Sequence, residues 1–382
     1  MSNTRKPLWE PTPSRIKTSH INRFIAHLNK KYKTNKQILK INSSAKLYDW
    51  SISNTNQFWS SIWDYCGIIA SKKGRTVLSN KNQMPGANWF PESRLNYAEN
   101  LLKLRSNKEA IVFQGEDRVT NRLTYSELYD AVSITAQALS ATGVKKGDRV
   151  AAFMPNLPDT IIFMLAATSL GALWSSCSPD FGTQGVLDRF GQIKPKILIG
   201  VDGYFYNGKE IDTTKKLSEI ANTLTSLKKV IVVPYTKARP NIQSIKHSVH
   251  LKDFVSRYGP KTIKFAQLPF NHPLFIMFSS GTTGVPKCIV HGHGGTLLQH
   301  LKEHQLHTDL KAEDRFFYFT TCGWMMWNWL VSGLASGATL LLYDGAPTYP
   351  SADSLFDFAE TERMSIFGTS AKYIDAINKL GV

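Results

Sequence analysis

Cysteine is scarce in this sequence: only four of its 382 residues are cysteine, at Cys66, Cys177, Cys288 and Cys322. They lie far apart and three of them have apolar neighbours, which excludes the dense disulfide framework of a small secreted domain. We therefore expect free thiols and a reducing compartment, the cytosol. Residues 1–7 lack the apolar core of a secretory signal, and residues 379–382 match no retention or peroxisomal address.

Acidic residues are the minority charge, with 29 Asp+Glu against 46 Lys+Arg and a formal net charge of +17. A basic balance suits nucleic acid, an anionic membrane or acidic small molecules. The basic residues are spread over the whole chain, and neither an arginine-rich block nor an aromatic RNA-binding motif accompanies them. We therefore expect an anionic nucleotide substrate, or merely a basic surface, and no nucleic-acid partner.

One long stretch without charge, from Thr321 to Tyr343, has the length of a membrane span. It contains Asn328 and several glycines, however, and it changes character to Thr-Leu-Leu-Leu-Tyr over residues 339–343. A buried helix followed by a core strand fits this pattern better than a membrane span.

Strands and helices alternate from Ala110 onward, which is typical of mostly parallel, helix-covered sheets. We expect Ser126 to cap the first helix of this body. Residues 1–105 are expected to form a helical and irregular cap, and residues 106–382 the α/β body. The first sheet is expected to take strands at 110–114, 149–154, 173–177, 196–201 and 229–233, with helices at 124–142, 158–171, 183–193 and 216–226. Residues 234–270 are expected to link it to a second sheet with strands at 273–278, 315–319, 339–343 and 365–368 and helices at 296–306 and 371–379.

Residues 279–287 read Ser-Ser-Gly-Thr-Thr-Gly-Val-Pro-Lys, directly after the apolar run 273–278. Backbone N–H groups, hydroxyl donors and one lysine at the end of a strand suit a polyphosphate. The spacing is not that of a Walker loop. A plain polar turn is the alternative, but it does not explain why so many phosphate-suited groups accompany one lysine. This loop therefore predicts a phosphate-binding site.

Two further clusters invite chemical interpretations. Cys288 with His291 and His293, and His300 with its neighbours at 304 and 307, suggest zinc, but neither is a strong zinc spacing, so we expect no metal site and a wet polar helix face. The aromatic run 322–329 is expected to be mostly core, although Trp324 follows a glycine near a predicted strand end, where pockets of α/β sheets lie. No Gly-x-Ser-x-Gly elbow is present, so hydrolase chemistry is unsupported.

The loop Ser279–Lys287 resembles the phosphate loop of the adenylate-forming enzymes, the superfamily of acyl-CoA synthetases, luciferases and peptide-synthetase adenylation domains. Residues 147–150 with 154–156 are similar to an early core motif of that family. Residues 89–90 with 95–100 are similar to the cap of its short-chain acyl-CoA synthetases. Pro7-Leu8-Trp9 and residues 84–102, 322–329 and 367–372 are similar to the branch that activates acetoacetate. The resemblance covers essentially the entire chain.

The resemblance implies a two-step reaction in which acetoacetate and MgATP form an acyl-adenylate and CoA then displaces AMP. It implies two further sets of contacts: an acyl pocket walled by Trp324, Met325 and Met326, and a CoA contact at Lys209, with Tyr206 where the family usually has arginine. It implies that ATP phosphates are held by Ser279, Ser280, Gly281, Thr282, Thr283, Gly284 and Lys287.

The resemblance also implies that the catalytic lysine, the ribose-binding aspartate and a Thr-Glu motif for Mg²⁺ and adenine lie beyond Val382. No catalytic residue is therefore assigned within residues 1–382, and we expect this polypeptide alone to form little or no acyl-adenylate. Two alternatives stay open: an acetyl- or propionyl-CoA ligase, and a truncated, non-catalytic isoform that binds a nucleotide or a partner.

Overall fold

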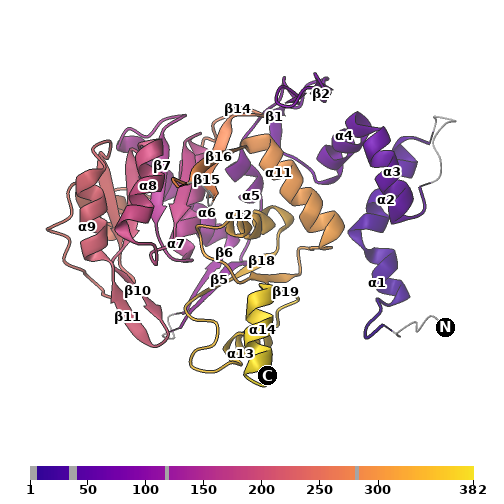
Figure 1. Cartoon of the computed structure of the whole chain (residues 1–382). Helices are drawn as coiled ribbons and strands as arrows, with labels where there is room; N and C mark the ends of the chain where they lie inside the picture. Colours follow the sequence, from indigo (N-terminus) through magenta and orange to yellow (C-terminus); the bar gives the residue numbers. More distant parts are fainter. Residues whose placement is uncertain (1–6, 34–40, 117–119, 280–283) are drawn as a thin grey trace.

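The computed structural model describes residues 7–33, 41–116, 120–279 and 284–382. Two sheets lie beside each other with helices between and around them, and a group of N-terminal helices packs at one side (Figure 1). The α/β class with helix-flanked, mostly parallel sheets, predicted from the alternating pattern, is confirmed.

The larger sheet has seven strands. All its neighbours run parallel except the last pair, which is antiparallel. Its spatial order is β13 (Ser248–His250), β12 (Lys229–Val233), β9 (Ile197–Val201), β7 (Arg149–Phe153), β8 (Leu173–Cys177), β15 (Pro273–Ser279) and β16 (Lys287–Gly292). Because the central strands are covered on both faces, they read as nearly continuous apolar runs.

Helices cover both faces of this sheet. They are α6 (Tyr125–Ala141), α7 (Pro158–Ser169), α8 (Thr183–Ile193), α9 (Thr214–Thr223) and, after β13, the short α10 (Leu251–Val255). Side chains of β7 alternate between the faces: Ala151 and Phe153 pack with α8 and α9, whereas Val150 and Ala152 belong to the core shared with α6 and α7. This alternation follows from the two-residue period of a strand.

The second sheet has five strands, in the order β19 (Ile366–Gly368), β17 (Arg315–Tyr318), β18 (Thr339–Asp344), β5 (Glu109–Gly115) and β6 (Thr120–Thr124). Only β6 runs antiparallel to its neighbour. The outer face packs on α13 (Ser354–Thr361) and α14 (Ala371–Lys379) through a cluster that includes Phe317 and Phe358. The chain therefore forms five layers, helix–sheet–helix–sheet–helix.

The assignment of strands to the two sheets differs from the prediction at two strands. β5 was expected to open the first sheet, yet it pairs with β18 of the second, with Leu340 opposite Ile111. β15 was expected to open the second sheet, yet it pairs with β8 of the first, with Phe275 opposite Trp174. The order of strands along the chain does not determine which strands pair, because pairing depends on contacts between residues far apart in sequence.

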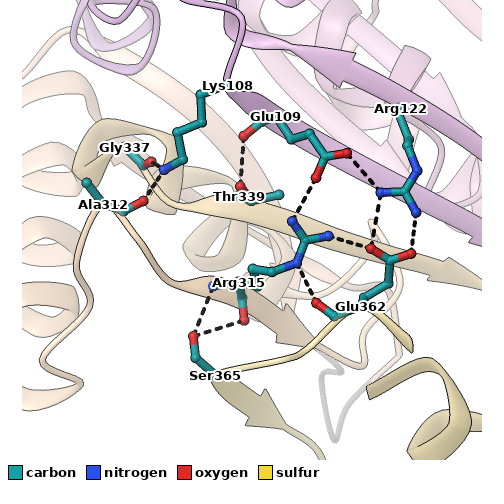
Figure 2. Close-up of polar contacts among 9 residues, drawn as sticks. All are labelled: Lys108, Glu109, Arg122, Ala312, Arg315, Gly337, Thr339, Glu362 and Ser365. Carbon is teal, nitrogen blue, oxygen red and sulfur yellow. Dashed lines mark hydrogen bonds and ion pairs between the residues drawn. The ribbon is translucent and has the colours of Figure 1, made fainter. Parts of the chain in front are cut away.

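An ion cluster joins three parts of the five-stranded sheet (Figure 2). Glu362, only 7% exposed, accepts hydrogen bonds from both Arg122 and Arg315. Glu109 accepts from the same two arginines, at 2.9 Å from Arg122 and 2.7 Å from Arg315. Burial alone would raise the pKa of Glu109, but these hydrogen bonds outweigh burial and hold that pKa below its usual value. The cluster therefore ties β5, β6, β17 and the turn after α13 together.

The N-terminal part consists mainly of helices and very short strands. Its aromatic side chains enter the main core: Trp63 lies 4.9 Å from Phe90 between ring centroids, and Phe90 lies 5.1 Å from Phe270. Its elements are α1 (Pro13–Thr18), α2 (His20–Lys31), α3 (Ser44–Ser53), α4 (Thr55–Tyr65), β1 (Ala70–Lys72), β2 (Leu78–Ser79), β3 (Asn88–Trp89), β4 (Arg94–Leu95) and α5 (Tyr97–Leu101), and β4 also pairs with β14 (Leu268–Pro269).

The N-cap of helix α6 lies two residues before the predicted one. Thr124, and not Ser126, is the N-cap: its hydroxyl accepts from the backbone N–H of Glu127, and the Glu127 carboxylate accepts from the backbone N–H of Thr124. This reciprocal capping box satisfies two donors that a helix start leaves open. The expectation for Ser126 is therefore wrong, because a threonine with a glutamate three residues later is the stronger start signal.

The charge-free stretch 321–343 forms the predicted buried helix and core strand. It contains α12 (Met325–Val331), the 3₁₀ turn η2 (Ser332–Ser336) and most of β18. Among the helices in the described ranges, none combines the length and the apolarity that crossing a bilayer requires.

Candidate active site

The predicted phosphate loop connects β15 to β16 at the carboxyl end of β15. Ser279 and Lys287 are paired partners of the two strands, so the two ends of the loop lie side by side. Gly284 has a φ of +116°, a conformation open to glycine and strained for other residues. Lys287 is exposed. Ser280, Gly281, Thr282 and Thr283 lie outside the described residues.

Helix α8 supports this hairpin from one side. Gln192 donates to the carbonyl of Pro286 at 2.9 Å, directly before Lys287. Arg189, one turn earlier, lies over the ring of Phe181 at 4.5 Å and over that of Phe278 at 5.9 Å. Phe278 directly precedes Ser279, so Arg189 adds a guanidinium near the loop. The sequence prediction missed Arg189, because one arginine in an amphipathic helix carries no distinctive signal.

The segment from Cys322 to Trp327 reaches this edge from the five-stranded sheet. The Cys322 carbonyl accepts a hydrogen bond from Ser176 of β8 at 2.6 Å, and its thiol donates to the carbonyl of Met154 at 2.8 Å. The Trp327 indole donates to Asn156 at 2.8 Å. The segment is therefore bound to the residues at and just beyond the carboxyl ends of β7 and β8.

A small cavity lies between this segment and the strand that carries the phosphate loop. Its walls include Trp174 of β8, Phe275 and Met277 of β15, and Cys322 and Asn328. The structure therefore brings β15, which leads into the predicted phosphate loop, close to residues that flank the predicted acyl wall, although they lie some forty residues apart in the sequence.

The three predicted acyl-pocket residues stand at the start of α12. Trp324 is the N-cap residue and is 66% exposed, Met325 is 44% exposed, and Met326 is half-buried. Trp324 was expected near a strand end, and it lies six residues after Tyr318, the last residue of the preceding strand β17. Trp327, by contrast, is fully buried. The described chain therefore fixes the backbone of this segment firmly, while the side chains of residues 324 and 325 face outward.

The predicted CoA contacts lie on a separate hairpin. Tyr206 ends β10 (Gly203–Tyr206) and pairs with Lys209, the first residue of β11 (Lys209–Asp212), and both side chains are exposed. The two-residue turn between them has positive φ at both positions, the geometry that an Asn-Gly pair favours. The backbone N–H of Gly208 donates to Glu116, just after β5. Within the described ranges, no hydrogen bond or cavity wall joins this hairpin to the phosphate loop.

The histidines do not form a wet polar face. They belong to α11 (His293–Lys302) and the π-helical turn η1 (Glu303–His307), and His293, His300 and His304 are buried. Ser332 links the ring of His300, at 2.7 Å, to the hydroxyl of Tyr97, at 2.5 Å. The polar-face expectation is wrong for His300 and His304, because the helix turns them toward η2 and the core, whereas His307 is exposed. In the part of the chain that the structure describes, no group of three ligating side chains could hold a metal ion.

These buried histidines predict a loss of stability on mild acidification. Burial lowers the pKa of His293 and His300 to about 3 each. The unfolded chain binds protons on these rings near its ordinary pKa of about 6.5, whereas the folded chain does not, so stability is present above that pH and falls as pH drops toward 3. Below about pH 6, we expect each of these histidines to lower the free energy of unfolding by about 1.4 kcal/mol for each pH unit.

Urea titrations between about pH 7.5 and about pH 5 measure this slope. His300→Gln keeps a donor for Ser332 but removes the titration, so its slope should be shallower by one histidine. A variant whose slope equals that of the unchanged chain would contradict the assignment.

With this geometry in place, comparison with known proteins shows the class. The family model described as AMP-binding enzyme matches residues 99–381, and the one described as Acetyl-coenzyme A synthetase N-terminus matches residues 44–101. The chain therefore belongs to the AMP-binding enzyme family.

The relatives are similar over nearly the whole chain. The acetoacetyl-coenzyme A synthetase of Rhizobium meliloti (strain 1021) is 50% identical over 377 residues, which cover 98% of this chain and 57% of that protein. The acetoacetyl-CoA synthetase of Gallus gallus is 44% identical and is covered to 56%. The solved structure of acetoacetyl-CoA synthetase from Streptomyces lividans superposes with a TM-score of 0.91 at 39% identity and covers 99% of this chain and 57% of that one. The chain thus spans little more than half the length of these relatives.

Proposed function

We propose that this chain provides the ATP-phosphate and acyl-binding walls of an acid–thiol ligase that converts acetoacetate, ATP and CoA into acetoacetyl-CoA, AMP and pyrophosphate. The observation that carries the proposal is the shared cavity between β15, which leads into the phosphate loop, and the segment that begins at Cys322. An enzyme that joins a carboxylate to the α-phosphorus of ATP needs these two binding regions within one small distance of each other.

In the first step the acetoacetate carboxylate attacks the α-phosphorus, the bond to the bridging oxygen breaks, and pyrophosphate leaves. Negative charge grows on the leaving phosphates, and the loop meets it with one lysine, hydroxyl donors and backbone N–H groups. In the second step the CoA sulfur attacks the acyl carbonyl and AMP leaves. We assign the phosphate contacts to Ser279, Ser280, Gly281, Thr282, Thr283, Gly284 and Lys287, with Arg189 as an added cation beside the loop.

ATP enters as its Mg²⁺ complex, so the ion belongs to the substrate. We assign the acyl wall to Trp324, Met325 and Met326, and the CoA contact to Lys209 with Tyr206. The hairpin that carries Lys209 is fixed to the five-stranded sheet through Glu116, which suits a contact that must keep its place during a two-step reaction. We also propose that the chain acts in the cytosol, which its four free cysteines support.

Titration calorimetry with MgATP, followed by ATP–pyrophosphate exchange, tests the proposal. We expect the 382-residue chain to bind MgATP and AMP, and to give little exchange on its own with acetoacetate. No binding of MgATP would overturn the assignment of the loop, and steady acetoacetate-dependent exchange would overturn the expectation of low activity.

An acetyl- or propionyl-CoA ligase is the alternative within enzymes, and a nucleotide-binding protein without catalysis is the alternative outside them. Met325 and Met326 bear on the choice between an acetoacetate ligase and an acetyl- or propionyl-CoA ligase, because the size and flexibility of their side chains determine the space for the acyl group. Exchange or binding measured across acetate, propionate and acetoacetate separates the ligases. Nucleotide binding that no acid alters favours the non-catalytic alternative.

A further inference from the structure

The acyl-pocket segment has a feature that its own side chains do not explain. Trp324 and Met325 are largely exposed, so packing of these two residues does little to hold them in one place. The N-cap of α12 makes no side-chain hydrogen bond either. The position of the predicted acyl wall must therefore come from the residues on each side of it.

Both sides are anchored in the seven-stranded sheet. Before the wall, the Cys322 carbonyl accepts from Ser176 at 2.6 Å, and the Cys322 thiol donates to the Met154 carbonyl at 2.8 Å. After the wall, the Trp327 indole donates to the Asn156 side chain at 2.8 Å. Met154, Asn156, Cys322 and Trp327 are buried and Ser176 is half-buried, so water has little access to these bonds.

The hydrogen-bond donor and the acceptor beside the Ser176 hydroxyl are complementary to it. The Trp174 indole donates to the Ser176 hydroxyl at 3.3 Å, and this hydroxyl donates its single proton to the Cys322 carbonyl. An indole only donates and a carbonyl only accepts, so the serine proton has one consistent direction. Ser176 is therefore the link through which β8 holds a segment that begins in the other sheet.

We infer that Ser176 is a positioning residue for acyl selectivity: through Cys322, and with Asn156 holding Trp327 on the far side, it sets where Trp324, Met325 and Met326 stand. The effect on acyl selectivity rests on the proposed function, whereas the effect on the position of residues 324–326 does not. We call the hydrogen bonds of Ser176 with Cys322 and of Asn156 with Trp327 the clamp. Nucleotide binding at the phosphate loop does not involve the clamp and should not depend on it.

The neighbouring Ser175 supplies a matched control. It lies on the same strand and is buried, whereas Ser176 is half-buried, and its hydroxyl donates to the Ile276 carbonyl of β15 at 2.8 Å and not to the acyl-pocket segment. Ser175→Ala and Ser176→Ala each remove one hydrogen-bonded hydroxyl from β8. Ser176→Thr keeps the hydroxyl and serves as the rescue.

The experiment has two readouts on the 382-residue chain. Hydrogen exchange followed by mass spectrometry reports the clamp: Ser176→Ala should speed exchange in peptides covering 321–331, whereas Ser175→Ala should not. Titration with two non-reactive adenylate mimics, acetoacetyl- and acetyl-sulfamoyladenosine, reports selectivity, and titration with MgATP reports binding at the phosphate loop. Loss of one hydrogen bond corresponds to roughly three- to tenfold, and we expect the preference between the two mimics to fall by this factor in Ser176→Ala.

Affinity for MgATP should stay unchanged in these variants, and Ser176→Thr should restore both readouts. Equal exchange in 321–331 for the unchanged chain and Ser176→Ala overturns the inference, whatever the ligands do. Faster exchange with an unchanged mimic preference overturns its selectivity part. If the unchanged chain binds neither MgATP nor a mimic, the proposed function fails, while the exchange result still decides whether Ser176 holds the segment.

Discussion

Glu362→Ala should lower the free energy of unfolding by about 3 kcal/mol, because it leaves two arginines without their buried partner. Glu362 is only 7% exposed, whereas Arg315 is 22% and Arg122 is 51% exposed. Removing one member of a fully buried ion pair costs about 3–5 kcal/mol, and the partial exposure of the arginines places this case at the lower end. Urea-induced unfolding followed by circular dichroism measures the change.

Glu360→Ala is the matched control, since Glu360 is the same residue type on α13, exposed at the surface. Its change should stay within about 0.5 kcal/mol. Glu362→Gln keeps the shape and removes the charge, and it should fall between the two. If Glu362→Ala and Glu360→Ala unfold at the same urea concentration, the cluster does not hold the five-stranded sheet together.

This cluster illustrates what the sequence alone could not reveal. Arg122 and Glu362 are 240 residues apart, and each on its own is an ordinary charged residue on a polar stretch. The clamp on the acyl-pocket segment is similar, because Ser176 lies 146 residues from Cys322 inside a strand that was predicted correctly. Side chains that join distant elements carry no local pattern, so sequence reasoning finds the elements and misses the bonds between them.

Elements with a strong periodic pattern were predicted well, because their signal lies in neighbouring residues. The helix at 183–193 and the strand at 173–177 have the predicted bounds, since burial on one face or both imposes a clear spacing of apolar residues. β16 was missed: it lies at a sheet edge, and its first four residues are exposed. β6 was missed too, because it is short, polar and at an edge. Edge strands face water and need no such pattern.

The phosphate loop could be predicted because the residues suited to phosphate are concentrated in nine consecutive positions. The prediction that Ser279 and Lys287 belong to one site gains support from their pairing across β15 and β16. Arg189 was missed because its relevance comes from the packing of α8 against the hairpin and not from its neighbours in sequence. One part of the candidate site is therefore recognisable from consecutive residues, and the other part depends on contacts between residues far apart in the sequence.

Lys287→Ala should weaken MgATP binding by about tenfold or more, close to 1.4 kcal/mol, and leave AMP binding nearly unchanged. Lys287 is exposed beside Ser279, and the proposed contact is with the β- and γ-phosphates, which AMP lacks. A lysine acts on phosphate as a point charge, so Lys287→Arg should retain part of the affinity and Lys287→Ala should flatten its dependence on salt. Titration calorimetry with both nucleotides measures these differences.

Lys252→Ala removes the same charge at the other side of the sheet. Lys252 is exposed on α10, directly after β13, and β13 and β16 are the opposite edges of the seven-stranded sheet. If the basic character of the whole chain attracts ATP, both variants should lose affinity equally, because each lowers the net charge by one. If the loop binds the outer phosphates, only Lys287→Ala loses affinity, and only for ATP. An equal loss for ATP and AMP in Lys287→Ala would place this lysine away from the β- and γ-phosphates and remove the central assignment of the loop.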